Sequence, residues 1–141
     1  MRFLIIFLSV LSIALTACDD DDNFTPIGTT HIYQTSEAGN LEDGTYVVNS
    51  AEEYVRLMNA RLPSDLNVDF KTGALVIVKG HETSGIDDIS VQSSRDISTY
   101  NIGISMSLNC FSAIEHWCVA VVMPAVANPS VVVDIERNGI Q

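Results

Sequence analysis

Residues 98–108 read STYNIGISMSL, and this stretch decides the fold. Every second residue from Tyr100 to Leu108 is apolar, whereas the residues between them are small or polar. An alternation with a period of two is typical of a strand that has one face in a core and the other in solvent. The stretch therefore predicts a long, half-buried β-strand.

Further segments with strand character lie on both sides of this stretch. The continuous apolar runs at 74–79 and 119–123 are typical of central strands, and 89–93 and 130–137 alternate. Two shorter strands are expected near 31–33 and 45–48. Polar loops are expected at 80–88 and 110–118. Because the links are short, we expect six or seven strands with mostly antiparallel pairing.

One helix is expected at residues 51–62. Ser50 and Glu53 form a capping box at its start, and Pro63 ends it. Its apolar residues fall on one face at helical spacing: Tyr54, Leu57, Met58 and Leu62. The expected fold class is α+β or mostly β, an antiparallel sheet or sandwich of about six strands with this one helix.

The N-terminus has the pattern of a bacterial lipoprotein leader. Arg2 precedes a largely apolar run at 3–15 that is too short to span a bilayer, and Leu15-Thr16-Ala17-Cys18 matches a lipobox. The pattern predicts that residues 1–17 are removed and that Cys18 is acylated with several lipid chains, enough for stable anchoring. The alternative is an ordinary signal peptide in which Cys18 is coincidental.

Four aspartates, Asp19–Asp22, follow the lipobox cysteine. The plain interpretation is a solvated spacer. The run also resembles the surface-export signal of lipoproteins in some Gram-negative bacteria, which implies the outer face of the outer membrane. Calcium binding is a third, less favoured interpretation, because the run lacks the turn and carbonyl ligands of a calcium loop.

Composition and charge limit the class of partner. The 141-residue chain has a net charge of −11, which argues against nucleic-acid binding and against broad contact with anionic lipid. The membrane link is therefore expected to be the N-terminal lipid alone. We expect a signal peptide at 1–17, an acidic tether at 18–42 and a single globular domain at 43–141.

Acylation of Cys18 leaves two cysteines, Cys110 and Cys118. An even pair in an exported protein predicts a disulfide, here closing a short loop. Two alternatives are weaker. Cys110, His116 and Cys118 form an incomplete zinc set without a fourth ligand at standard spacing, and Cys118 with His116 is a conceivable nucleophile and base.

Other polar residues suggest chemistry only in combination. His81-Glu82 and Asp87-Asp88 are candidate cation ligands in one loop, although a solvated polar loop explains them as well. Asp69 is either an acid or, in the favoured interpretation, the cap of a turn. Because P-loop, nucleophile-elbow and His-Glu-x-x-His motifs are absent from the sequence, we assign no catalytic, cofactor-binding or metal-binding residues.

Residues in the predicted disulfide loop are candidates for partner binding. Phe111, His116 and Trp117 lie in or beside it, and an exposed Trp is a frequent interface anchor. The alternative for Trp117 is a place in the core.

Short motifs in residues 45–136 resemble the protease-complex (PrcB-like) lipoprotein family. They are the capped helix, Val68-Asp69-Phe70, the apolar strand ending at Gly80, Ser84-Gly85, and Pro124 before the last strand. Ser84-Gly85-Ile86 departs from the family's double glycine and aromatic, and the segment with Cys110 and Cys118 is extra. The resemblance implies a non-catalytic partner of a surface protease or similar complex.

These observations favour a lipid-anchored, non-enzymatic binding or accessory protein of a surface complex at the outer membrane, without cofactor. The alternatives are a small metal-dependent hydrolase that uses the 81–88 loop, and a structural envelope protein without a specific ligand.

Overall fold

The computed structural model describes residues 29–34, 37–38 and 40–139. This part of the chain forms one sheet and one short helix. The elements in chain order are β1 (Thr30–Tyr33), β2 (Gly44–Val48), α1 (Ala51–Met58), β3 (Gly73–Asp96), β4 (Thr99–Pro124) and β5 (Ser130–Asn138). The sheet order is β1-β4-β3-β2, and β5 also pairs with β4. Within the described residues, α1 is far too short to cross a membrane.

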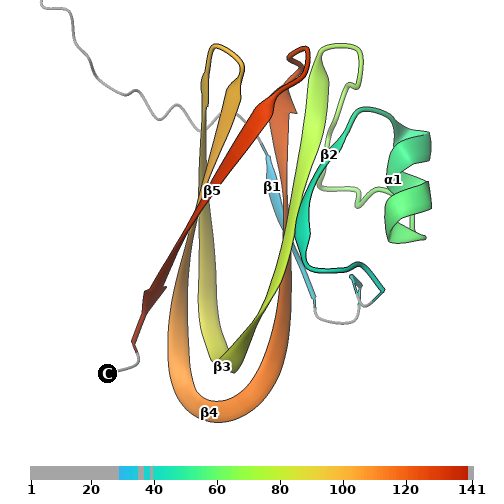
Figure 1. The fold of residues 1–141 in the computed structure, drawn as a ribbon. Coiled ribbons are helices and arrows are strands. Elements are labelled where there is room, and N and C mark those ends of the chain that lie inside the picture. The colour runs from blue at the N-terminus through green and yellow to red at the C-terminus, as the bar shows by residue number, and fades with distance from the viewer. Residues whose placement is uncertain (1–28, 35–36, 39, 140–141) are drawn as a thin grey trace, which may run out of the picture.

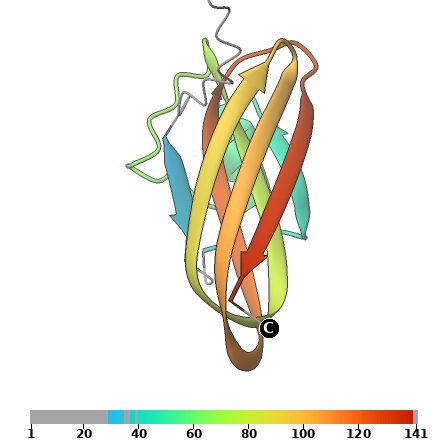
Figure 2. The ribbon, with the colours of Figure 1, turned by 90° about the vertical axis from the view of Figure 1, so that its left-hand side faces the viewer.

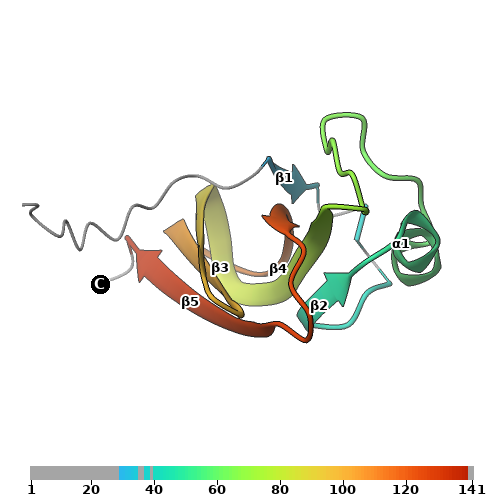
Figure 3. The ribbon, with the colours of Figure 1, turned by 90° about the horizontal axis from the view of Figure 1, so that it is seen from above.

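The β3–β4 hairpin supplies both layers of the domain. It runs through a bend near its middle, so that its two arms face each other (Figure 1). In the first arm, β2 pairs with β3 up to Lys79 and β1 pairs with β4 from Cys118 to Val121. In the second arm, β5 runs parallel to β4 from Thr99 to Ser107. Seen from above, β3 and β4 curve around a common centre and α1 lies outside the first arm (Figure 3).

Two hydrophobic clusters occupy the two faces of the first arm. The inner cluster lies between the arms and contains Val76, Val119 and Val121 from the first arm with Tyr100, Ile102, Ile104 and Met106 from the second. The outer cluster lies under α1 and contains Tyr54, Met58, Leu75, Ile77 and Ala120. The first arm is therefore buried on both faces, which explains its continuous apolar sequence.

Irregular pairing produces the bend. The β3–β4 register shifts three times between Glu82 and Asp88, where Asp88 pairs with Ser107 and Glu82 pairs with Glu115. Between these two pairs β3 has five residues and β4 has seven. Bulges of this kind bend a strand. Through the bend the inward-facing positions of β3 change from even numbers, such as Val76 and Val78, to odd numbers, such as Ile89 and Val91.

Small residues allow close packing next to the bend. The indole of Trp117 lies over Gly80, and a Cβ atom at position 80 would overlap it. Gly85 has the same relation to the side chain of Asn109. The Trp117 ring therefore requires a glycine at position 80, whereas a side chain at position 85 would displace the Asn109 amide.

An ion pair joins the two layers at the bend. Arg137, near the end of β5, donates from Nε to both carboxylate oxygens of Glu82 at 3.0 and 2.9 Å and from Nη2 to Oε1 at 2.9 Å. The Glu82 side chain is only 10% exposed, whereas that of Arg137 is 47% exposed. The hydrogen bonds to Glu82 raise the pKa of the Arg137 guanidinium. A bidentate, partly buried pair of this kind fixes geometry as well as energy.

The start of the helix agrees with the sequence pattern and its end does not. The Ser50 hydroxyl accepts from Glu53 N at 3.1 Å, and the Glu53 carboxylate accepts from Asn49 N at 2.7 Å. The expected end at residue 62 is wrong, because α1 ends at Met58. Asn59 adopts a left-handed conformation (φ 52°) and its N–H donates to the Val55 carbonyl. Asn is one of the few residues that caps a helix in this way.

The expected fold class is confirmed: the domain is mostly β, largely antiparallel, with one helix. The loops expected at 80–88 and 110–118 are wrong, since both segments belong to β3 and β4 and merge the expected strands. The expected tether at 18–42 also overlaps β1. Tyr33 of β1 is buried and its hydroxyl lies 2.8 Å from that of Tyr54 on α1. The leader, Cys18 and Asp19–Asp22 lie outside the described residues.

Removal of the Arg137 side chain should destabilise the domain. Arg137→Ala leaves the Glu82 carboxylate at the bend without its cation, and we expect a loss of about 2 kcal/mol in the free energy of unfolding. Arg95→Ala is the matched control, because Arg95 is exposed at the far end of the hairpin. Urea unfolding of both variants measures the difference. Equal stability of the two variants would contradict a structural role for the pair.

Candidate functional site

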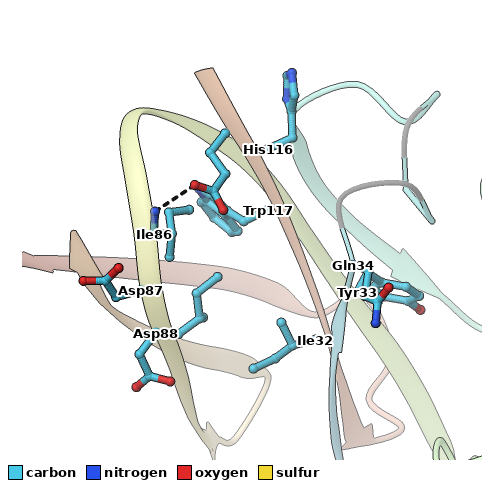
Figure 4. A pocket seen from close by; sticks show the side chains of 10 residues that line it. Ile32, Tyr33, Gln34, Ile86, Asp87, Asp88, His116 and Trp117 are labelled. Carbon is cyan, nitrogen blue, oxygen red and sulfur yellow. Dashed lines mark hydrogen bonds between the residues drawn. The ribbon is translucent and has the colours of Figure 1, made fainter. Parts of the chain in front are cut away.

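The three residues expected to bind a partner do not form one surface. Phe111 is 73% exposed and His116 is exposed, but Trp117 is only 4% exposed and belongs to the inner cluster. Neighbouring residues of a strand point to opposite faces, so His116 faces outward while Trp117 faces the core. Figure 4 shows Trp117 on the side of β4 that faces Ile86 and His116 on the other side. The interpretation of Trp117 as an exposed anchor is therefore wrong.

Residues 109–114 of β4, called the β4 bend below, form the most prominent apolar feature near these residues. Phe111 is 73% exposed and Ile114 is 70% exposed. Figure 2 shows that the bend of β4 projects beyond β3 at one end of the molecule. Exposure of two large apolar side chains to water is unfavourable in free energy. Burial of these side chains against a partner would remove that cost. The sequence analysis missed Ile114.

An open pocket of about 290 Å³ lies beside the β4 bend. Its apolar part comes from Ile32, Ile86, Ile89 and Trp117, and its acidic part from Asp87, Asp88 and Glu115 (Figure 4). Two of these carboxylates also hold the bend in place. Glu115 accepts from Ile86 N at 2.8 Å, and Asp87 accepts from the Asn109 amide at 2.6 Å. The pocket therefore presents negative charge beside the β4 bend, and two of its carboxylates are held in place by hydrogen bonds.

The expected disulfide is not formed: Cys110 and Cys118 are both free thiols. Both lie on β4, Cys110 in the exposed bend and Cys118 in the buried part of the first arm. Cys118 is opposite Lys79 in the outer cluster, whereas Cys110 is exposed at the β4 bend. Within the described part of the chain, His116 groups with Asp43 and His81 as potential metal ligands and not with Cys110 or Cys118.

Burial makes Cys118 unsuitable as a nucleophile. Desolvation raises the pKa of its thiol to about 12, against an opposing effect of the nearby Lys79 charge. The reactive form of cysteine is the thiolate, so a thiol that stays protonated at neutral pH is inert. The Cys118–His116 dyad therefore has no chemical support.

The side chains expected to form a cation site in a loop at 81–88 are divided among different partners. Glu82 is paired with Arg137 and Asp87 with Asn109. Asp69, further along the sequence, accepts from Lys71 N at 3.0 Å, so its interpretation as the cap of a turn is confirmed.

His81 belongs instead to a cluster with Asp43 and His116. One ligand atom from each of the three side chains lies within 4.8 Å of the other two. His81 Nδ1 is hydrogen-bonded to Asp43 Oδ2, and the two imidazole centroids are 5.8 Å apart. All three residues are exposed. The sequence analysis named both histidines but missed Asp43, since the three come from separate segments joined only by the strand register.

A scan against protein-family models, a search of curated proteins and a search of solved structures each found no match. The resemblance to the protease-complex lipoprotein family therefore stays a prediction.

The two strand cysteines should differ sharply in reactivity. With an alkylating reagent at neutral pH, we expect Cys110 to be modified in the folded chain, and Cys118 to be modified only after denaturation. The reason is the exposure of Cys110 and the burial of the protonated Cys118 thiol. Mass spectrometry of the digested chain reports each cysteine separately. Protection of both cysteines until a reductant is added would instead indicate a disulfide and contradict the structure.

Proposed function

We propose that this chain is a lipid-anchored, non-catalytic binding domain of a bacterial cell envelope. In this proposal, the β4 bend and the acidic pocket beside it contact a protein partner that carries basic side chains. The observation that carries the proposal is the pair of exposed apolar residues, Phe111 and Ile114, on a projection next to fixed carboxylates. Interfaces commonly combine an apolar centre with a charged rim that selects the partner.

The position of the bend relative to the start of the domain supports this role. Thr30, the first residue of β1, is opposite Val121, and β1 runs toward the bend as far as Tyr33 opposite Cys118. Figure 2 shows the β1 arrow pointing toward the end where β4 projects. An anchor that precedes Thr30 would therefore join the domain at the end of β1 that lies farther from the β4 bend.

The engagement of the polar residues favours binding over catalysis. Glu82, Asp87 and Asp69 are committed to pairs that hold strands and turns, and Cys118 is kept protonated by burial. Side chains that are hydrogen-bonded in this way stabilise the fold. A catalytic group instead needs a polar atom that is available to the substrate.

Loss of the lipobox cysteine tests the anchor. Cys18→Ser should abolish incorporation of labelled palmitate and move the protein from the membrane fraction to the soluble fraction, because the lipid is the proposed membrane attachment. Cys110→Ser is the matched control and should keep both the label and the membrane location. Palmitate incorporation into the Cys18→Ser chain would contradict the proposal.

Substitution at the β4 bend tests the contact surface. The double variant Phe111→Ala/Ile114→Ala should lose partner capture in a cross-linked pull-down from intact cells by about tenfold or more, as expected when interface anchors are removed. Ile97→Ala is the matched control, because Ile97 is 89% exposed at the opposite end of the hairpin. Capture should also weaken at high salt, since the pocket supplies negative charge.

Two results would contradict the proposed contact. The first is equal capture by the double variant and the Ile97→Ala control, which would place the contact elsewhere. The second is recovery of the protein alone, which would favour the structural envelope role. Protease treatment of intact cells before cross-linking reports whether the domain faces outward.

A further inference from the structure

Three neighbouring segments bring two imidazoles and a carboxylate to one edge of the first arm. His81 on β3 and His116 on β4 are directly opposite each other in the antiparallel pair. Asp43 immediately precedes β2, whose first residue pairs with Lys79. Directly opposed residues have Cβ atoms about 5 Å apart, which is close enough for both side chains to reach one ion.

The backbone around Asp43 is held on both sides by hydrogen bonds. The Leu41 carbonyl accepts from Nζ of the buried Lys79, and the Glu42 carbonyl accepts from the Tyr46 hydroxyl at 2.9 Å. The two histidines are held by the regular pairing of β3 and β4. The backbone positions of the three residues are therefore set by the fold before any ligand arrives, which favours binding.

A surface hydrogen bond explains only part of this arrangement. The Asp43–His81 contact accounts for two of the residues, and an exposed pair of this kind contributes little to stability. It does not account for His116, whose ring lies 5.8 Å from that of His81 on the same face. A second imidazole beside an imidazole–carboxylate pair is a set of ligands for a transition metal.

We propose that Asp43, His81 and His116 bind one divalent transition-metal ion of the zinc class. The site lies on the outer face of the first arm and includes no residue of the β4 bend, although His116 also lines the acidic pocket. It goes beyond the proposed partner binding and does not depend on it.

The ligand atoms need only small movements to close around the ion. They lie within 4.8 Å of one another, and two ligands of a tetrahedral zinc ion stand about 3.3 Å apart. The His81 and Asp43 side chains are 50% and 40% exposed, so both are free to rotate. The ion takes the place of the Asp43–His81 hydrogen bond. Three protein ligands leave a further coordination position for water or for a donor from a partner.

Zinc titration of the tag-free, metal-depleted full chain tests the site. We expect one zinc ion bound in competition with a chromogenic chelator, and an affinity lower by about tenfold or more in His81→Ala and in His116→Ala. His31→Gln is the matched control, because it removes the one other histidine of the chain and should leave zinc affinity unchanged. Asp43→Asn should weaken binding while it keeps the size of the side chain.

Cobalt(II) provides a second measurement that reports ligand geometry. The wild-type chain should show the visible absorption of a four-coordinate Co²⁺ ion, and the His81→Ala/His116→Ala double variant should not. Because these side chains are exposed, the double variant should keep the unfolding temperature of the metal-free chain. Equal zinc affinity in wild type and double variant, or the absence of zinc binding by the wild type, would overturn the proposal. Neither result would bear on capture at the β4 bend.

Discussion

Apolar contact between the two arms of the β3–β4 hairpin is the interaction on which the rest of the domain depends. Each arm alone would be a ribbon with one apolar face in water. Folding the hairpin on itself buries Tyr100, Ile102, Ile104 and Met106 against the valines of the first arm. Full burial of an aliphatic side chain such as that of Ile102, Ile104 or Met106 stabilises the fold by about 1.5–3 kcal/mol. The helix then covers the remaining apolar face of the first arm, and Tyr33 of β1 packs into the same cluster.

The bend that makes this contact possible also creates the unusual features of the surface. β4 uses more residues than β3 to turn the corner, so part of β4 cannot lie against β3 and projects instead. Phe111 and Ile114 are exposed because they lie in this excess segment. Inside the corner, Gly80 makes room for Trp117, and the Glu82–Arg137 pair ties β5 to the first arm. Contacts inside the corner thus stabilise the irregular pairing, whereas the additional residues of β4 are exposed on its outside.

Sequence patterns located the elements whose signal is local. The alternation from Tyr100 to Leu108 identified the inner face of the second arm, and Ser50 with Glu53 identified the start of α1. The segments at 80–88 and 110–118 were mistaken for loops because their polar and mixed residues do not alternate where the register shifts. Cysteine parity suggested a disulfide, whereas β4 places one thiol in its exposed bend and the other in the buried part of the first arm. The register between distant segments decides both whether these residues form strands and whether the cysteines meet. A short stretch of sequence does not contain that information.

The same register links the two candidate sites. His116 and Trp117 are adjacent, so β4 directs one outward to His81 and Asp43 and the other inward over Gly80. A slip of one residue in the pairing would exchange them, burying an imidazole and exposing an indole. The large apolar surface of Trp117 opposes that slip, as does the fit of its ring over Gly80. Burial of Trp117, which also lines the acidic pocket, therefore keeps His116 on the outer face, where the proposed ion would bind.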